Sequence, residues 1–214
     1  MSKFFDWIWR RKRIVMMGTS GAGKTTIQQV MLEGKDVSPN SIKLITRGDH
    51  METTRFNGRR YRLFDTAGAY DVFSQPSFMK KFEAAHYVIY VFDCNRYIEA
   101  KKHNKIPVHS QYNVLLDSGA DSEEGIKEYL EETETWLNRM IEAAIDTHKK
   151  MLIVASHLDL FKLANPGKND SDVRRFLTQN LVEGTQIVDI EILDVTKKED
   201  IQKMLERLNT LEPL

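Results

Sequence analysis

Runs of apolar residues along the chain predict strands that are buried on both faces of a sheet. The clearest runs are residues 14–17 (IVMM), 86–93 (HYVIYVFD) and 151–155 (MLIVA), and a fourth covers residues 186–193. Their branched and aromatic composition is typical of central, doubly covered strands. Residues 26–32 follow the first run and are expected to form a helix.

Two further segments, residues 122–147 and 199–211, have the three-and-four spacing of amphipathic helices. Their expected inward positions are Ile126, Leu130, Thr133, Leu137, Met140, Ile141 and Ala144 in the first segment, and Ile201, Met204, Leu205 and Leu208 in the second. Because helices alternate with buried strands, the pattern predicts a three-layer α/β domain that binds ligands at the carboxyl ends of its strands.

The sequence also predicts a β-hairpin. Residues 51–56 and 61–64 flank Asn57-Gly58, a dipeptide that favours a tight antiparallel turn. With these two strands the sheet should have about six strands, mostly parallel with one antiparallel edge.

The first buried run leads into a phosphate-binding motif of the form G-x-x-x-x-G-K-[ST]. Its residues are Gly18, Thr19, Ser20, Gly21, Ala22, Gly23, Lys24 and Thr25. A strand, a loop and a helix in this order point successive backbone N–H groups and a helix N-terminus at one anion. Lys24 is expected to hold the β- and γ-phosphates, the Thr25 hydroxyl to ligate Mg²⁺, and Thr26 to add a further nucleotide contact. The chain is therefore predicted to bind a nucleotide phosphate.

A second motif, D-x-x-G, ends the hairpin at residues 65–68. Asp65 at the tip of a strand can reach Mg²⁺ through water, and the backbone N–H of Gly68 can approach the γ-phosphate. The pattern alone is common, but its place one hairpin after a P-loop indicates a function.

Composition narrows the class of protein. Of 214 residues 41% are apolar, and 31 basic residues balance 31 acidic ones, so no overall charge favours nucleic acid as a partner. The single cysteine, Cys94, excludes an intramolecular disulfide and fits a reducing cytoplasm; a small buried residue is its expected role. No apolar run approaches the ~20 residues of a membrane span.

Residues 1–13 differ from the domain expected over residues 14–214. Apolar and aromatic residues there precede a basic cluster: Phe4, Phe5, Trp7, Ile8 and Trp9, then Arg10, Arg11, Lys12 and Arg13. Such a segment suits an anionic membrane surface, so we expect a cytoplasmic protein with peripheral membrane contact. An arm that packs on its own domain or on a partner is the alternative. Ser2 excludes N-myristoylation.

The P-loop, Thr46-Arg47-Gly48 ahead of the hairpin, and the D-x-x-G motif together resemble the Ras superfamily of small GTPases, most of all its ADP-ribosylation-factor and Rag branches. The resemblance covers residues 13–211 apart from one insertion. It implies the P-loop NTPase fold, GTP and GDP with Mg²⁺ as ligands, and protein effectors or regulators as partners.

The resemblance also assigns roles around the γ-phosphate. Thr46 would bind Mg²⁺ through its hydroxyl and sense the γ-phosphate through its backbone, and Lys24, Thr46 and Gly68 would form the catalytic set. Thr53 and Thr54 are less suitable than Thr46, since they lie inside a predicted strand.

Ser156-His157-Leu158-Asp159 stands where this superfamily carries its guanine-reading N-K-x-D sequence. Asp159 would accept hydrogen bonds from guanine N1–H and the exocyclic amine, a donor pair that adenine lacks. His157 could stack on the base in place of lysine, and Ser156 could keep one hydrogen bond of the asparagine that ties this loop to the P-loop. The alternative for Asp159 is a helix-capping aspartate.

The final base-binding loop is expected after the last strand. There a backbone N–H of Val195 or Thr196 would contact the guanine oxygen, as the resemblance implies. Side-chain identity says little about a backbone contact, so either residue fits.

One departure from the superfamily concerns turnover. After D-x-x-G, members that hydrolyse GTP well usually carry a glutamine that orients the attacking water. Here that position is Ala69, followed by Tyr70, and neither side chain is suited to hold a water. Slow intrinsic hydrolysis is therefore expected.

Residues 96–121 form a stretch that compact superfamily members lack. Its lysines predict a solvated basic loop, with a partner-binding insertion as the alternative. No cysteine or carboxylate falls at ligand spacing from His103 and His109, so no metal site is expected there.

Three functions follow from these patterns. The first is a GTP-binding switch with slow hydrolysis, and the second is an interaction module that keeps its nucleotide without turnover. A P-loop kinase or ATPase is less suitable, because such proteins usually lack an acidic residue at the position of Asp159.

Overall fold

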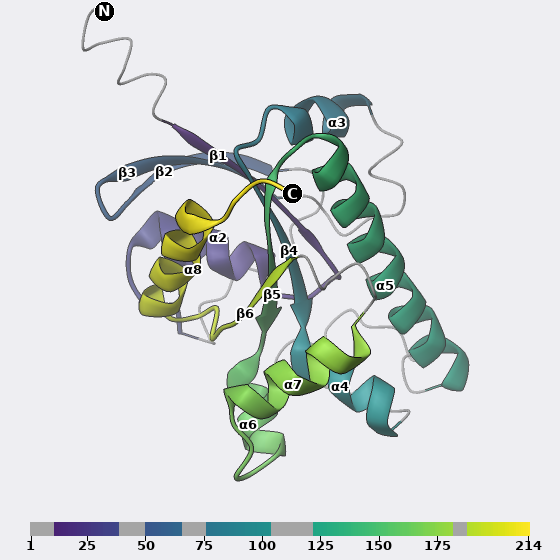
Figure 1. Ribbon diagram of the computed structural model, residues 1–214. Helices are drawn as coiled ribbons and strands as arrows, with labels where there is room; N and C mark the ends of the chain where they lie inside the picture. Colours follow the sequence, from purple (N-terminus) through teal and green to yellow (C-terminus); the bar gives the residue numbers. More distant parts are fainter. Residues whose placement is uncertain (1–10, 39–49, 66–75, 104–121, 182–187) are drawn as a thin grey trace, which may run out of the picture.

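The computed structural model describes residues 11–38, 50–65, 76–103, 122–181 and 188–214. At its centre lies a six-stranded sheet with the order β2-β3-β1-β4-β5-β6 (Figure 1). Neighbouring strands pair in parallel except for β2 and β3. The predicted sheet, mostly parallel with one antiparallel edge strand, is confirmed.

The strands are β1 (Lys12–Gly18), β2 (His50–Phe56), β3 (Arg59–Asp65), β4 (Tyr87–Asp93), β5 (Lys150–Ser156) and β6 (Asp189–Ile192). The helices are α2 (Lys24–Glu33), α3 (Pro76–Glu83), α4 (Cys94–His103), α5 (Glu123–Asp146), α6 (Leu158–Ala164), α7 (Asp170–Asn180) and α8 (Lys198–Thr210). The helices predicted after the P-loop, over residues 122–147 and at the C-terminal end are confirmed.

Helices cover both faces of the sheet, as the unbroken apolar strands require. In β1, Ile14 and Met16 join a core with α2 and α8, while Val15 and Met17 join the core on the opposite face with α3, α5 and α7 (Figure 1). Because successive side chains of a strand point to opposite faces of the sheet, β1 contributes residues to both cores. This arrangement places the carboxyl ends of β1, β4, β5 and β6 along the same side of the sheet, which is called its carboxyl edge below.

The hairpin turn is formed by the expected dipeptide. Asn57 has φ 47° and Gly58 has φ 77°, the left-handed pair that a two-residue turn between twisted strands requires. The turn also contacts α8, since Asn57 Nδ2 donates to Gln202 Oε1 at 2.9 Å.

The first part of the predicted basic loop is a helix instead. Residues 94–103 form α4, in which Tyr97, Ile98 and Ala100 are buried against the core. The Asp93 side chain caps this helix by accepting from the backbone N–H of Arg96 at 3.0 Å. The loop prediction was wrong over these residues because it weighed the lysines on the exposed side and not the apolar residues on the other. Residues 104–121 lie outside the described part.

α5 has nearly the predicted inward face. Its N-cap is Ser122, whose Oγ accepts from Gly125 N at 3.0 Å, and two glutamates in the first turn suit the helix dipole. Tyr129 is buried where Leu130 was expected; Leu130 is only partly buried.

β1 begins at Lys12, two residues before the predicted domain boundary. In the parallel register Lys12 is opposite Tyr61, and the Arg13 backbone N–H donates to His86 Nδ1 at 3.1 Å. Part of the basic cluster thus belongs to the sheet, and residues 1–10 lie outside the described part. Among the helices that the structure describes, none is long and apolar enough to cross a membrane.

Candidate functional site

The P-loop starts at Gly18. Any other residue at this position would force the neighbouring backbone to move. Gly18 has φ 144°, and a Cβ at this position would lie 1.7 Å from the carbonyl oxygen of Val91 in β4. The backbone of the loop therefore leaves the sheet pressed against the neighbouring strand. This contact fixes where the loop begins.

Lys24, the first residue of α2, is held inside the loop. Its side chain is buried, and Nζ donates to the carbonyl oxygens of Gly18 at 2.8 Å and Thr19 at 2.9 Å. The ammonium group is thus fixed over the loop, where its charge attracts an anion.

The N-terminus of α2 has the features of an anion site. Its N-cap, Gly23, lies in the left-handed region and makes no side-chain cap, and the first turn of α2 contains no acidic residue. The first N–H groups of the helix, those of Lys24, Thr25 and Thr26, therefore have no carboxylate of their own turn to bind. A phosphate would supply that negative charge.

Three segments distant in sequence meet at Gly23. A Cβ built on Gly23 would lie 2.8 Å from Val195 Cγ2 and 3.8 Å from His157 Cε1. Val195 follows β6 and His157 follows β5, so the P-loop, the tetrad and the final loop converge at the carboxyl edge of the sheet. Of the residues that the sequence assigned to one nucleotide, the structure brings Gly23, His157 and Val195 together.

Side-chain hydrogen bonds tie the tetrad to β4. Ser156 Oγ donates to the carbonyl oxygen of Phe92 at 2.9 Å and lies 2.8 Å from His157 Nδ1. A hydroxyl has one proton, so His157 must donate from Nδ1 to Ser156 Oγ. Asp93 Oδ2 lies 3.7 Å from the same ring nitrogen. The hydrogen bond expected from Ser156 to the P-loop is thus replaced by bonds to Phe92 and His157.

Asp159 is presented to solvent. It lies in the first turn of α6, behind the N-cap residue His157, which has φ 59°. Its carboxylate is exposed and accepts no hydrogen bond from the residues that the structure describes. The helix-capping explanation of Asp159 is therefore wrong, and the carboxylate is available to a ligand, with the helix dipole favouring its charge.

In the loop after β6, hydrogen bonds distinguish the two candidate N–H donors to a base, those of Val195 and Thr196. Asp194 Oδ1 accepts from the backbone N–H of Thr196 at 3.0 Å and from its hydroxyl at 2.6 Å. For Val195, whose side chain is buried against Gly23, no described residue accepts from the backbone N–H. Geometry therefore favours Val195 over Thr196 as the backbone contact to a base.

Two candidate metal ligands lie near the loop. Thr25 is half-buried in the first turn of α2, and Asp65 ends β3 opposite Met16 of β1 in the parallel register. No group of three or more His, Cys, Asp or Glu side chains that could hold a metal ion exists among the described residues. A hydroxyl oxygen such as that of Thr25 is a donor of the kind that Mg²⁺ accepts.

A buried polar cluster behind the P-loop was not predicted from the sequence. Thr19 Oγ1, Tyr129 Oη and Arg96 Nε are buried, and none has a hydrogen-bond partner in the described part of the chain. The Arg96 guanidinium lies 4.9 Å above the Tyr129 ring. The helical spacing of Tyr129 from Ile126 and Thr133 was the signal that could have revealed it.

Burial dominates the protonation behaviour around this cluster. Burial raises the pKa of Glu132, and Glu128 raises it further, while Lys24 and Arg96 act in the opposite direction. Burial also raises the pKa of the Cys94 thiol, whose Sγ donates to the Ser156 carbonyl oxygen. Cys94 is therefore the small buried residue that was expected, and an unreactive one.

Thr46, Gly68 and Ala69 lie outside the described residues. Their assigned roles at the γ-phosphate stay predictions.

Comparison with known proteins decides the family. The model of a GTPase family described as "50S ribosome-binding GTPase" matches residues 13–157, more than half of the chain. The chain belongs to this GTPase family. As a member of a GTPase family, it has a guanine nucleotide as its ligand.

A solved structure supports the fold of this GTPase. The Arl6 BBS3 small GTPase from Trypanosoma brucei, with the bound nucleotide analogue GppNp, aligns with a TM-score of 0.55 and 15% identity. The alignment covers 93% of this chain and 95% of that one. At this identity the likeness shows the fold alone. No curated protein matches the sequence.

Proposed function

We propose that this GTPase is a molecular switch that requires Mg²⁺ and hydrolyses GTP slowly. The observation that carries the proposal is that Val195 and His157 both lie beside Gly23, which places the three predicted nucleotide loops together. The γ-phosphate and Mg²⁺ would hold the segments around Thr46 and Gly68, and hydrolysis would release them.

Each residue of the site has a distinct part in this proposal. Lys24 neutralises charge on the β- and γ-phosphates, and the N–H groups at the start of α2 bind phosphate oxygens. Thr25 and Asp65 would hold Mg²⁺, which would supply positive charge next to the phosphates. Asp159 reads guanine, and the Val195 N–H contacts its oxygen.

In this proposal hydrolysis is slow because no side chain at position 69 orients the attacking water. Ala69 offers a methyl group where a glutamine amide would orient the attacking water. Binding and charge neutralisation by Lys24 do not depend on that side chain. Binding is therefore retained while turnover is weakened.

A second candidate is an interaction module whose nucleotide is never turned over. The observation that favours it is the buried chain of contacts from Phe92 through Ser156 to His157 and Asp93. It fixes the base-binding loop to the sheet through side chains, as a site with a permanently bound nucleotide would need.

One experiment separates these functions. The purified protein is denatured, its nucleotide is identified by chromatography, and hydrolysis of γ-labelled GTP is followed over hours in a single turnover. GDP with slow hydrolysis supports the switch, GTP without hydrolysis supports the module, and ATP contradicts both. In the switch, A69Q should raise the rate by at least about tenfold, whereas A69S, a matched small substitution, should not.

We also propose that residues 2–10 contact an anionic membrane surface, while the described domain lies in the cytoplasm. The aromatic residues and the adjoining basic cluster support this. Co-sedimentation with phosphatidylserine vesicles should be lost on deletion of residues 2–10, which leaves β1 intact. Equal pelleting of the deletion variant, or pelleting with neutral vesicles alone, would contradict it.

A further inference from the structure

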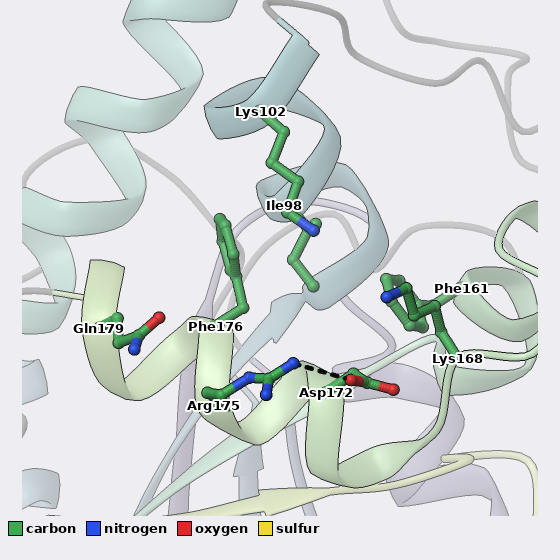
Figure 2. Close-up of a pocket in the computed structure, with 8 residues that line it drawn as sticks. All are labelled: Ile98, Lys102, Phe161, Lys168, Asp172, Arg175, Phe176 and Gln179. Carbon is green, nitrogen blue, oxygen red and sulfur yellow. Dashed lines mark hydrogen bonds and ion pairs between the residues drawn. The ribbon is translucent and has the colours of Figure 1, made fainter.

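A small pocket lies between α4, α6 and α7, at the carboxyl edge of the sheet. Its volume is about 200 Å³ (Figure 2). Ile98 and Phe161, both buried, and the half-buried Phe176 supply its apolar surface. The pocket shares no residue with the nucleotide site described above.

Positive charge dominates the rim of this pocket. Lys102 approaches from α4, Lys168 from the segment between α6 and α7, and Arg175 from α7, as Figure 2 shows. The one carboxylate of the lining, Asp172, is already used by its own helix. Its Oδ1 accepts from Arg175 Nη2 at 3.1 Å, and its Oδ2 accepts from the backbone N–H of Asn169 at 3.0 Å.

Two of the cations form no ion pair with a residue that the structure describes, namely Lys102 and Lys168. Lys102 Nζ lies 4.6 Å from the centroid of the Phe176 ring, a cation–π contact that holds the ammonium group at the rim. Within the described part of the chain, the pocket therefore combines an apolar floor with a rim in which positive charge exceeds negative charge.

From this arrangement we propose that the pocket is the docking site for an acidic segment of a protein partner. A carboxylate of the partner lies among Lys102, Lys168 and Arg175, and a neighbouring apolar side chain contacts Phe161 and Phe176. Charge complementarity selects the acidic residue, and burial against the two rings supplies the anchor.

Size and position favour a protein segment over other occupants. A cavity of 200 Å³ is smaller than the ~300–1,000 Å³ of small-molecule sites, so it accepts one or two anchoring side chains and not a whole metabolite. The helices that line the pocket, α4, α6 and α7, lie at the end of the sheet opposite the start of β1 at Lys12 (Figure 1).

A random peptide library displayed on phage tests the proposal on the full-length, GDP-loaded protein. Enriched peptides should carry Asp or Glu beside an aromatic or aliphatic residue. Their affinity should fall at least about tenfold in K102E and R175E, and on replacement of the acidic residue by its amide. The matched control is K203E, which makes the same charge change on α8, where Lys203 pairs with Asp200 at 3.0 Å.

Several outcomes overturn the proposal. They are enrichment without acidic residues, equal affinity in wild type, K102E and R175E, and a loss in K203E as large as in the pocket variants. Binding that inorganic phosphate alone abolishes, with the carboxylates dispensable, reassigns the pocket to phosphate. All four proteins should bind GDP equally, because the substituted residues are exposed and remote from the P-loop. The proposal thus does not depend on GTP turnover.

Discussion

The phosphate-binding and base-binding ends of this site are built in different ways. At the phosphate end the geometry comes from the backbone: Gly18 is pressed against β4, Gly23 takes a left-handed conformation, and Lys24 bonds to loop carbonyls. At the base end it comes from side chains, through Ser156 and His157.

This difference explains why the two ends match the motifs of small GTPases unequally. A site made of backbone groups needs glycine at fixed positions and one lysine, so its motif survives intact. A site made of side chains can be rebuilt from other side chains, as the contacts of Ser156 and His157 with Phe92 and Asp93 show. Sequence similarity therefore fades toward the base while the arrangement of the loops persists.

The strongest test of the backbone-built end is G18A. The new Cβ would lie 1.7 Å from the Val91 carbonyl oxygen, so the strands must separate. We expect the free energy of unfolding, measured by urea titration, to fall by on the order of 3–5 kcal/mol. G34A is the control, because Gly34 also has a positive φ but a Cβ there meets nothing within 4 Å; it should cost about 1 kcal/mol. Equal losses would show that strain, and not the contact with β4, decides.

K24A tests the one side chain on which the phosphate end depends. Loss of its charge-assisted hydrogen bonds should weaken GDP binding at least about 100-fold in a fluorescence titration with a labelled nucleotide. K35A is the control, since Lys35 is exposed and pairs with Glu33 at 3.5 Å. A K24A affinity within threefold of that of K35A would contradict the assignment.

D159N tests the base end. Replacing the exposed carboxylate by an amide should lower GDP affinity by roughly 10–100-fold and shift preference toward xanthine nucleotides. Stability should stay unchanged, because the side chain has no partner among the described residues. D170N, at the corresponding first turn of α7, should leave nucleotide affinity and preference unchanged and lower stability by less than about 1 kcal/mol, because its pair with Lys162 is exposed. Unchanged preference in D159N removes this residue from base recognition.

S156A tests whether the hydrogen bonds of Ser156 at the base end stabilise the fold. Removing the buried hydroxyl leaves His157 Nδ1 and the Phe92 carbonyl oxygen without this partner, which should cost about 1–3 kcal/mol of unfolding free energy. S171A, an exposed serine of α7, is the matched control. A stability equal to that of wild type would show that the network is not structural.

His86 lies at the end of the sheet remote from the nucleotide site. H86N is expected to give the smallest effect of these variants. Burial lowers the pKa of His86, and Lys12 and Arg13 lower it further. The folded protein therefore disfavours protonation, and stability is lost as the pH falls below the ordinary histidine value of about 6.5. Asn keeps an acceptor for the Arg13 N–H without titrating. The stability of H86N should decline less between pH 7.5 and 5.5, by less than about 1 kcal/mol, with unchanged GDP affinity; parallel curves contradict this.

Much of the fold could be predicted because its signals are local. Unbroken apolar runs gave the central strands, Asn57-Gly58 gave the hairpin, and the P-loop placed the site at one edge. α4 was missed because its buried face is short and its lysines face solvent.

The candidate site was predictable to a different extent in each part. The P-loop motif identifies its own phosphate-binding residues, but Asp93 and Phe92, which contact the tetrad, lie far from it in sequence. Asp93 and Phe92 reach the tetrad because β4 pairs with β5 in one register, which no local pattern reveals. The same holds for Arg96 and Tyr129, which meet behind the P-loop from two separate helices.

The contact between Gly23 and Val195 has a consequence during protein synthesis. The two residues lie at nearly opposite ends of the chain, so the nucleotide site is incomplete until the ribosome has released β6 and the loop behind it. A ligand that binds only the folded form stabilises only chains that can fold its site. Guanine nucleotide would therefore stabilise chains that include β6 and the loop behind it, and not shorter ones.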